Sequence, residues 1–256
     1  MLPVITVTLP SYAVMATIGL LVALIFIYFR LDKIGLIFGD FLIYIMAAAV
    51  CGFCGARILF VITMIPEIIR DHLLFGYYLL NGGIVFYGGM FGVLAGIALV
   101  SKIRKQKVSE VYGIMIPAFP LFHSFARIGC LLAGCCYGKA WNWGIVPVDE
   151  PAVVRFPVQF FESLCDLVIF VIIMVCEHWY GRKYNLYLYL GSYAICRFIL
   201  EFFRGDTVRG IWIGGLSTAQ IISLLILVWL IWIIFQKRLA MTRAGRRYTG
   251  RREIKR

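Results

Sequence analysis

The residues best suited to chemistry lie in one short stretch, HSFARIGCLLAGCCYGK, at 123–139. It places His123 four residues before Arg127 and follows them with three cysteines in an otherwise apolar run. An imidazole can accept a proton near neutral pH, and a guanidinium can bind a phosphate or a carboxylate through two parallel hydrogen bonds. The arginine and the histidine therefore indicate phosphate and proton chemistry, whereas the three thiols have no evident role.

Charged side chains recur in the apolar runs around this stretch, at spacings of three or four residues. Such spacings place side chains on the same face of a helix. A charge within a membrane-spanning helix is costly, so it usually marks a functional site or an internal ion pair. The residues that share a face are His123 with Arg127, Glu162 with Asp166, and Tyr193 with Arg197, Glu201 and Arg204.

The composition places these charges in a membrane protein. Of the 256 residues, 62% are hydrophobic and 15% are charged, and the mean hydropathy is +0.91, whereas roughly a quarter of the residues in a soluble domain are charged. We predict an all-α integral membrane protein whose seven transmembrane helices form one domain, residues 1–236. The first run is too long for a signal peptide, so we expect it to remain as a span. The apolar runs cover about 11–30, 40–64, 83–101, 110–134, 158–179, 186–204 and 217–236.

Basic residues gather in alternate connections between these runs, which sets the expected orientation. The N-terminus then lies outside and the C-terminus in the cytoplasm. The last basic segment, residues 237–256, holds nine Lys or Arg and one acid and directly follows a span. We expect this cytoplasmic tail to bind anionic membrane lipids rather than nucleic acid. The other basic connections contain Arg30 and Lys33, the four basic residues of 102–107, and Arg182 and Lys183.

In this orientation the charged residues of the spans, Arg57 among them, all lie toward the outer face. We therefore expect one polar cavity that opens on that side. The arginines outnumber the acids if some acids are protonated at depth, so the cavity favours an anion, and a lipid phosphate is the commonest anion in a membrane. The alternative is a set of ion pairs that neutralise each other and only hold the bundle together.

Glycines add a possible backbone contribution to the site. The segment NGGIVFYGGMFGVLAG at 81–96 has two glycine pairs around Tyr87. Glycines at four-residue spacing allow close helix packing, and the pairs also allow an unwound loop whose N–H groups face the cavity. Gly129, Gly134 and Gly138 similarly predict that the fourth spanning helix breaks near its arginine.

Five segments, in their order along the chain, resemble motifs of the bacterial prolipoprotein diacylglyceryl transferases. The resemblance extends from about residue 11 to 225. It implies a seven-helix enzyme of the bacterial cytoplasmic (inner) membrane with its active site toward the outer face. The similar segments are GGIVFYGG at 82–89, ARIGCLLAGCCYG at 126–138, FPVQFFES at 156–163, YAICRFILEFFR at 193–204 and STAQIIS at 217–223, and Tyr12 is similar to an early tyrosine of the family.

This family transfers a diacylglyceryl group from phosphatidylglycerol to the thiol of the lipobox cysteine in a prolipoprotein signal peptide and releases glycerol phosphate. By resemblance, Arg127 and Arg197 stabilise the departing phosphate. We expect no cofactor and no metal site. The resemblance assigns the substrate site to Tyr12, Arg57, Gly88, Gly89, Gly129, Gly134, Gly138, Glu162, Tyr193, Glu201, Arg204 and Gln220.

Three polar positions of the family motifs differ in this chain. Tyr87 stands where the family has a loop histidine, and Cys130 and Cys135 stand where it has asparagine and glutamate. Tyr87 remains a candidate catalytic residue by its position. His123, one turn before Arg127, is a candidate base for the acceptor thiol, and the alternative is a hydrogen-bonded helix histidine.

The cysteines allow more than one interpretation. Cys130 and Cys135 can form a disulfide across the predicted break, or they can be small apolar fillers together with Cys136. A rival class of protein is a membrane thiol oxidoreductase or metal-handling protein that uses these thiols with Cys51 and Cys54. The cluster of arginines favours the transferase, or a related lipid transferase with a different acceptor.

Overall fold

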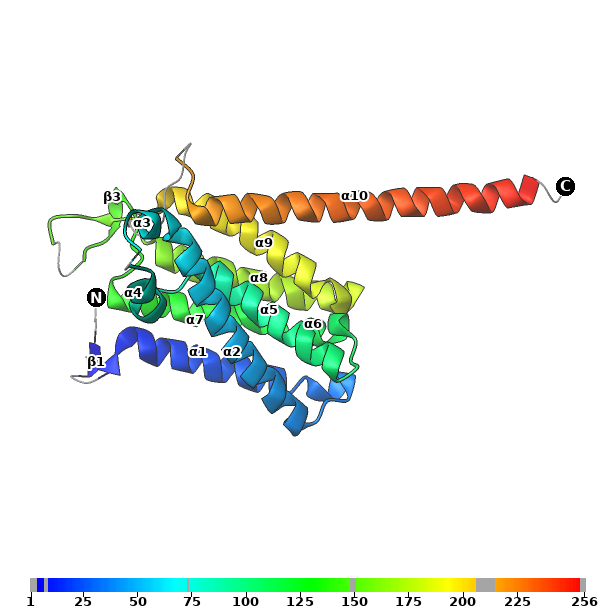
Figure 1. The fold of residues 1–256 in the computed structure, drawn as a ribbon, viewed down its shortest axis with the longest axis horizontal. Coiled ribbons are helices and arrows are strands. Elements are labelled where there is room, and N and C mark those ends of the chain that lie inside the picture. Colours follow the sequence, from blue (N-terminus) through cyan, green and yellow to red (C-terminus); the bar gives the residue numbers. More distant parts are fainter. Residues whose placement is uncertain (1–3, 7–8, 73, 148–150, 206–214, 254–256) are drawn as a thin grey trace.

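The chain folds into a bundle of long helices. Seven helices in the described part are long and apolar enough to cross a membrane, which confirms the predicted number. The computed structural model describes residues 4–6, 9–72, 74–147, 151–205 and 215–253 (Figure 1). The spans are α1 (Ser11–Tyr28), α2 (Phe38–Thr63), α5 (Phe86–Ile103), α6 with α7 (Val108–Met115 and Ala118–Ala133), α8 (Val158–Tyr180), α9 (Asn185–Leu200) and α10 (Thr218–Glu253).

Shorter elements join the spans. Two of them, α3 (Ile65–Arg70) and α4 (Leu74–Asn81), occupy a segment that the apolar pattern assigns to a connection. In Figure 1, α3, α4 and β3 lie at the end of the bundle where α1 begins. The remaining short elements are β1 (Val4–Thr6), which pairs antiparallel with β2 (Leu9–Pro10), η1 (Leu31–Ile34), β3 (Ala140–Ile145), η2 (Arg182–Tyr184) and η3 (Glu201–Phe203).

The fourth span is interrupted, but not where the glycines predict. Its two helices, α6 and α7, are separated by a turn at residues 116–117. Pro117 has no N–H to donate to the preceding turn, which explains an interruption there. The prediction of a break near Arg127 is wrong, because α7 continues through Arg127 and ends at Gly134, whose φ is 76°. A glycine in this left-handed conformation is a common helix end.

Glycines also bring α2 and α5 into close contact. A Cβ added to Gly55 would lie 3.0 Å from the Cα of Gly92, and one added to Gly89 would lie 3.4 Å from the Cβ of Ala56. Gly88 faces the carbonyl of Gly55. The predicted packing role of these glycines is confirmed. The expected unwound loop is confined to residues 82–85, because α5 begins at Phe86 and includes both Gly88 and Gly89.

Buried apolar side chains surround the polar interior of the bundle. One cluster includes Tyr87 from α5, Ile169 from α8 and Tyr189 from α9, and it borders the charged residues described below. Many apolar side chains on the outside are exposed, for example Phe29 and Trp179. An apolar outer surface is what a helix facing lipid requires, since the bilayer solvates such side chains.

A separate ion pair lies where α1 and α8 end. Arg30, at the end of α1, is buried and lies 2.5 Å from Glu177 of α8, and Asn185 also donates to Glu177. The final helix, α10, continues through residues 237–253 of the predicted tail and projects beyond the bundle (Figure 1). Residues 254–256 of that tail lie outside the described residues.

Candidate active site

Glu162 is the centre of the charged site. It lies in the second turn of α8 and is 5% exposed. Its Oε2 lies 3.1 Å from Nε of Arg127 on α7, and its Oε1 pairs with Nη1 of Arg197 on α9. Nη1 of Arg204, just after η3, lies 3.7 Å from the same Oε1. Three arginines from three segments of the chain therefore surround one carboxylate inside the bundle.

A second carboxylate completes this arrangement. Glu201 is 1% exposed, and its Oε2 lies 2.7 Å from Nη2 of Arg197, one helical turn earlier. Three guanidinium groups thus face two carboxylates, and the Asp166 carboxylate lines the same cavity. Guanidinium groups also bind phosphate, so a cluster of three arginines can accept an additional anion.

His123 and Asp166 form a pair beside this cluster. Nδ1 of His123 lies 2.9 Å from Oδ2 of Asp166, and both side chains are buried. The imidazole also stacks on the ring of Phe86, with the ring centroids 4.2 Å apart. A carboxylate that orients an imidazole is the arrangement that supports a general base. Asp166 was not among the predicted site residues, although its spacing of four from Glu162 was an available signal.

Two tyrosines line the same region. The hydroxyl of Tyr87 lies 2.6 Å from Oγ of Ser223 on α10, so this side chain joins α5 to the last helix. The ring of Tyr193 lies near those of Tyr87 and His123, with centroids 5.9 and 5.6 Å away. The Tyr193 hydroxyl is buried and has no hydrogen-bond partner among the described residues. An unpartnered buried hydroxyl is available to a ligand.

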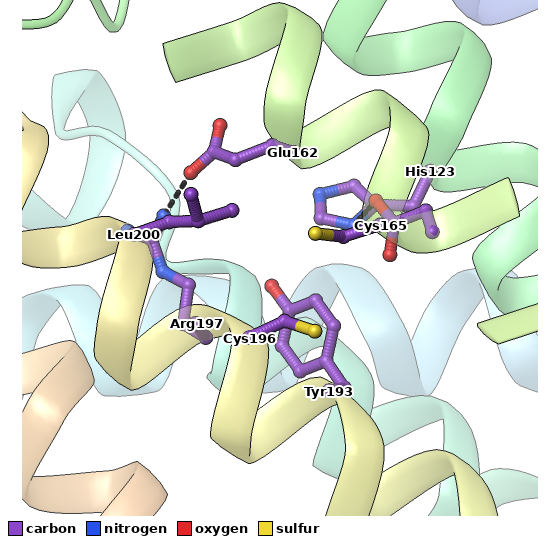
Figure 2. A pocket seen from close by; sticks show the side chains of 8 residues that line it. His123, Glu162, Cys165, Tyr193, Cys196, Arg197 and Leu200 are labelled. Carbon is purple, nitrogen blue, oxygen red and sulfur yellow. Dashed lines mark hydrogen bonds and ion pairs between the residues drawn. The ribbon is translucent and has the colours of Figure 1, made fainter. Parts of the chain in front are cut away.

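The cavity at this site is small. It lies between His123, Glu162, Asp166, Tyr193 and Arg197, and its volume is about 10 Å³, room for about one water molecule. Figure 2 shows the Glu162–Arg197 contact on one side of it and the sulfur atoms of Cys165 and Cys196 directed toward its centre. The polar cavity that the charged residues predict is therefore small in the described part of the chain, because their side chains contact one another.

One predicted site residue lies elsewhere. Arg57 is directed at the backbone between α4 and α5, where its Nη1 donates to the carbonyl of Gly82 and its Nη2 to that of Leu80, at 3.3 Å. Arg57 thus holds the segment before α5 and does not join the arginines around Glu162. The sequence predicted the same depth for Arg57 as for these arginines, but its side chain contacts the backbone before α5 instead.

The predicted glycines divide between helix contacts and loop geometry. Gly88 and Gly89 lie in the contact between α2 and α5, as described above. A Cβ on Gly129 would lie 3.2 Å from the Cα of Tyr12, so this glycine lets α7 approach α1. Gly134 ends α7, and Gly138 forms a β-bridge with Arg204. Gly138 thus contacts the segment that carries Arg204.

Gln220 stabilises the start of α10. Its backbone N–H donates to Oγ of Ser217 at 3.2 Å, and its side-chain Oε1 accepts from the Ser217 N–H at 3.0 Å. This reciprocal pair is a capping box, which satisfies two donors at a helix N-terminus. Gln220 is buried and its Nε2 reaches the carbonyl of Phe198 on α9, so it also holds α10 beside the arginine helix.

All eight cysteines are free thiols in the structure, so the first of the two alternatives, a Cys130–Cys135 disulfide, is absent. Arg127 lies close to the first of them, with its Nη1 3.9 Å from Sγ of Cys130. The thiols thus adjoin the charged cluster without belonging to its ion pairs.

The fold and the site together define a polytopic membrane protein with a buried cluster of three arginines around two glutamates. The family model described as prolipoprotein diacylglyceryl transferase matches residues 1–236. The chain belongs to this family, and it is an integral-membrane transferase.

Curated relatives carry the same family name. The chain is 38% identical over 191 residues to phosphatidylglycerol–prolipoprotein diacylglyceryl transferase 2 of Clostridium perfringens, covering 70% of this chain and 72% of that protein. It is 31% identical over 237 residues to the phosphatidylglycerol–prolipoprotein diacylglyceryl transferase of Clostridium tetani, covering 85% and 89%. The enzyme of the same name from Acinetobacter baumannii is 29% identical over 202 residues, covering 72% and 73%.

Proposed function

We propose that this chain transfers a diacylglyceryl group from phosphatidylglycerol to the thiol of the lipobox cysteine in a prolipoprotein signal peptide. A sulfur–carbon bond forms to the glyceryl carbon, and the bond from that carbon to the phosphate oxygen breaks. Glycerol phosphate leaves with the electron pair, and the thiol proton passes to a base. The observation that carries this proposal is the convergence of Arg127, Arg197 and Arg204 on Glu162.

The arginines suit the leaving group of this reaction. The phosphate gains negative charge as its bond to the diacylglyceryl carbon breaks, so preorganised guanidinium groups stabilise the transition state more than the ground state. In the structure the Glu162 carboxylate receives these guanidinium contacts. A phosphate has the same planar pairs of oxygens for an arginine fork and takes over part of them. Arg127 and Arg197 act on the leaving phosphate, and Arg204 adds to the positive field.

His123 is the base in this proposal. Its pair with Asp166 fixes the orientation of the ring and stabilises the imidazolium that forms when the acceptor thiol loses its proton. The Tyr193 hydroxyl, directed into the same cavity, donates to an oxygen of the bound lipid. Tyr87 positions this wall through Ser223 rather than taking the proton itself.

The lipid enters only after the ion pairs separate. A cavity of about 10 Å³ cannot hold a phosphoglycerol headgroup. Arg127 and Glu162 lie on different helices, as do Arg197 and Glu162, so a movement between α7, α8 and α9 opens the site. The closed pairs keep the charges neutralised while no substrate is bound.

We place the protein in the bacterial cytoplasmic membrane, with its N-terminus and active site toward the outer face and its C-terminus in the cytoplasm. The alternating basic connections support this orientation. Glu162 lies near the start of α8, and Arg204 bridges to Gly138 just before β3. The 102–107 connection instead joins α5 to α6. The basic segment after α10 then meets the anionic cytoplasmic leaflet.

The test is a transfer assay with the purified full-length protein. A lipobox peptide is incubated with phosphatidylglycerol, and its mass is measured together with the released glycerol phosphate. We expect the peptide to gain one diacylglyceryl group, and a peptide with serine in place of the lipobox cysteine to gain none. Transfer that is equal with phosphatidylethanolamine, or absent with phosphatidylglycerol, would contradict the proposal.

A further inference from the structure

Three thiols converge where α7 ends. Cys130 lies in the last turn of α7, and Cys135 and Cys136 lie in the loop that follows. Their Sγ atoms all lie within 4.8 Å of one another. The proposed transfer gives none of these thiols a role, although they adjoin the arginine that acts on the phosphate.

The backbone is bent so that this convergence occurs. Gly134 has a φ of 76° and Cys136 has a φ of 56°, and the second value is uncommon for a residue other than glycine. The loop folds back on the helix, where the N–H of Cys135 donates to the carbonyl of Cys130 at 3.2 Å. Nε2 of Gln159 on α8 donates to the carbonyl of Cys135 at 2.8 Å. Two helices therefore fix the position of the loop thiols.

Packing alone does not explain the three thiols. Cys130 is buried, but Cys136 is only partly buried and Cys135 is exposed, so these side chains do not fill an apolar gap. A thiol pair across the loop would also leave the third sulfur unused. Three sulfurs within 4.8 Å of one another can instead serve as the donor set of a metal site.

The surrounding charges suit thiolate ligands. Nη1 of Arg127 lies 3.9 Å from Sγ of Cys130, and a guanidinium stabilises a nearby thiolate. Three thiolates around a monovalent or divalent cation have a net negative charge. Such a centre is compatible with the neighbouring Arg127 guanidinium, whereas a cation held by neutral ligands would be repelled by it.

The donor set also selects the class of metal. Thiolates are soft ligands and favour Zn²⁺ or Cu⁺ over Mg²⁺ or Ca²⁺. A zinc–sulfur distance of about 2.3 Å separates tetrahedral sulfur ligands by about 3.8 Å. Small side-chain rotations bring sulfurs that already lie within 4.8 Å to that spacing. Three protein ligands leave one coordination position for water or an added ligand.

We infer that Cys130, Cys135 and Cys136 form a binding site for one soft d¹⁰ cation, Zn²⁺ or Cu⁺. This goes beyond the proposed transfer, which requires no metal, and it differs from the expectation of no metal site. The bound cation ties the end of α7 to the loop up to Gly138. That loop pairs with the segment of Arg204, where the N–H of Lys139 donates to the carbonyl of Phe203 at 2.8 Å. The cation thereby fixes the distance between two arginine segments of the site.

The test measures metal bound to the purified full-length protein in detergent, with all thiols reduced under anaerobic conditions. Separate samples are loaded with Zn²⁺, Cu⁺ or Mg²⁺, freed of unbound metal by dialysis, and analysed for metal per chain. We expect about one equivalent of Zn²⁺ or Cu⁺ and no retained Mg²⁺. Cd²⁺ serves as a spectroscopic probe, because thiolate ligands give it a charge-transfer absorption.

Alanine variants identify which cysteines bind the metal. Cys135→Ala and Cys130→Ala should each lose the bound metal and the Cd²⁺ absorption. Cys135 is exposed, so its replacement by alanine should not disturb the core. The control is that the metal-free variant has the same elution profile and melting temperature as the metal-free wild type. Cys54→Ala and the double change Cys165→Ala with Cys196→Ala are the controls and should retain the metal. The inference is overturned if the wild-type chain retains neither Zn²⁺ nor Cu⁺, or if Cys135→Ala binds as much as the controls.

Discussion

Nε of Arg127 lies 3.1 Å from Oε2 of Glu162, and this contact joins α7 to α8 inside the bundle. The same carboxylate pairs with Arg197 of α9, so one acid connects three spans. Glu162 thus has two effects in our account. It stabilises the bundle by neutralising the arginines, and it occupies the contacts that a substrate phosphate uses during the reaction.

Replacing Glu162 with glutamine should therefore weaken the fold. The change keeps the size of the side chain but leaves buried guanidinium groups without their counter-charge, which we expect to lower the free energy of unfolding by about 3 kcal/mol. The measurement is denaturation of the purified protein in detergent. Glu67→Gln, at an exposed residue of α3, is the control and should unfold as the wild type does. Equal stability of Glu162→Gln and the wild type would show that the ion pairs do not hold these spans.

His123→Gln should reduce transfer by about 100-fold at neutral pH, because a positioned base contributes at least that factor. The deficit should shrink as pH rises, since an acceptor thiol with an ordinary pKa of about 8.5 then ionises without help. The measurement is the rate of peptide lipidation at a series of pH values between about 6 and about 9.5. A deficit that stays constant over this interval would exclude His123 as the base.

Asp166→Asn tests the positioning role separately. Asparagine keeps the size of the side chain but removes the charge that stabilises an imidazolium, so we expect a lower kcat with little change in KM for phosphatidylglycerol. Its pH profile should resemble that of His123→Gln. An unchanged kcat would mean that the contact of 2.9 Å between Asp166 and His123 is structural.

The orientation can be measured by labelling intact cells with a membrane-impermeant maleimide. We expect Asn142→Cys, on exposed β3, to be labelled from outside, and Lys107→Cys, in the basic connection before α6, to be protected. The unmodified chain supplies the background of its native thiols. Labelling of Lys107→Cys from outside would reverse the proposed topology.

The sequence predicted the spans and the charged faces well. Apolar length located all seven spans, and helical spacing correctly grouped His123 with Arg127 and Glu162 with Asp166. The structure pairs these two faces across α7 and α8. Sequence spacing describes one helix at a time, so it could not show that three arginines contact Glu162, whereas only Arg197 pairs with Glu201 in the contacts described above. It also could not show that Arg57 turns toward the carbonyl of Gly82.

Two features of the structure had signals in the sequence. The break in the fourth span was expected at the glycines near Arg127, although Pro117 was the stronger helix interruption. The segment STAQ at 217–220 has the spacing of a capping box, which identifies Gln220 as the partner of Ser217. The small volume of the cavity had no such signal, because whether charged side chains contact one another depends on the packing of three helices.

The most direct test of the central claim compares Arg127→Lys and Arg197→Lys with the control Arg104→Lys. Arg104 directly follows α5 and pairs with Asp40. Each protein is incubated with phosphatidylglycerol and a lipobox peptide, and the rate of diacylglyceryl transfer is measured from the peptide mass. Lysine keeps the charge but not the fork that binds two phosphate oxygens. We predict that Arg127→Lys and Arg197→Lys remain folded and lose on the order of 100-fold in rate, whereas Arg104→Lys retains the wild-type rate. Wild-type rates in both Arg127→Lys and Arg197→Lys would contradict the account, because neither arginine would then act on the departing phosphate.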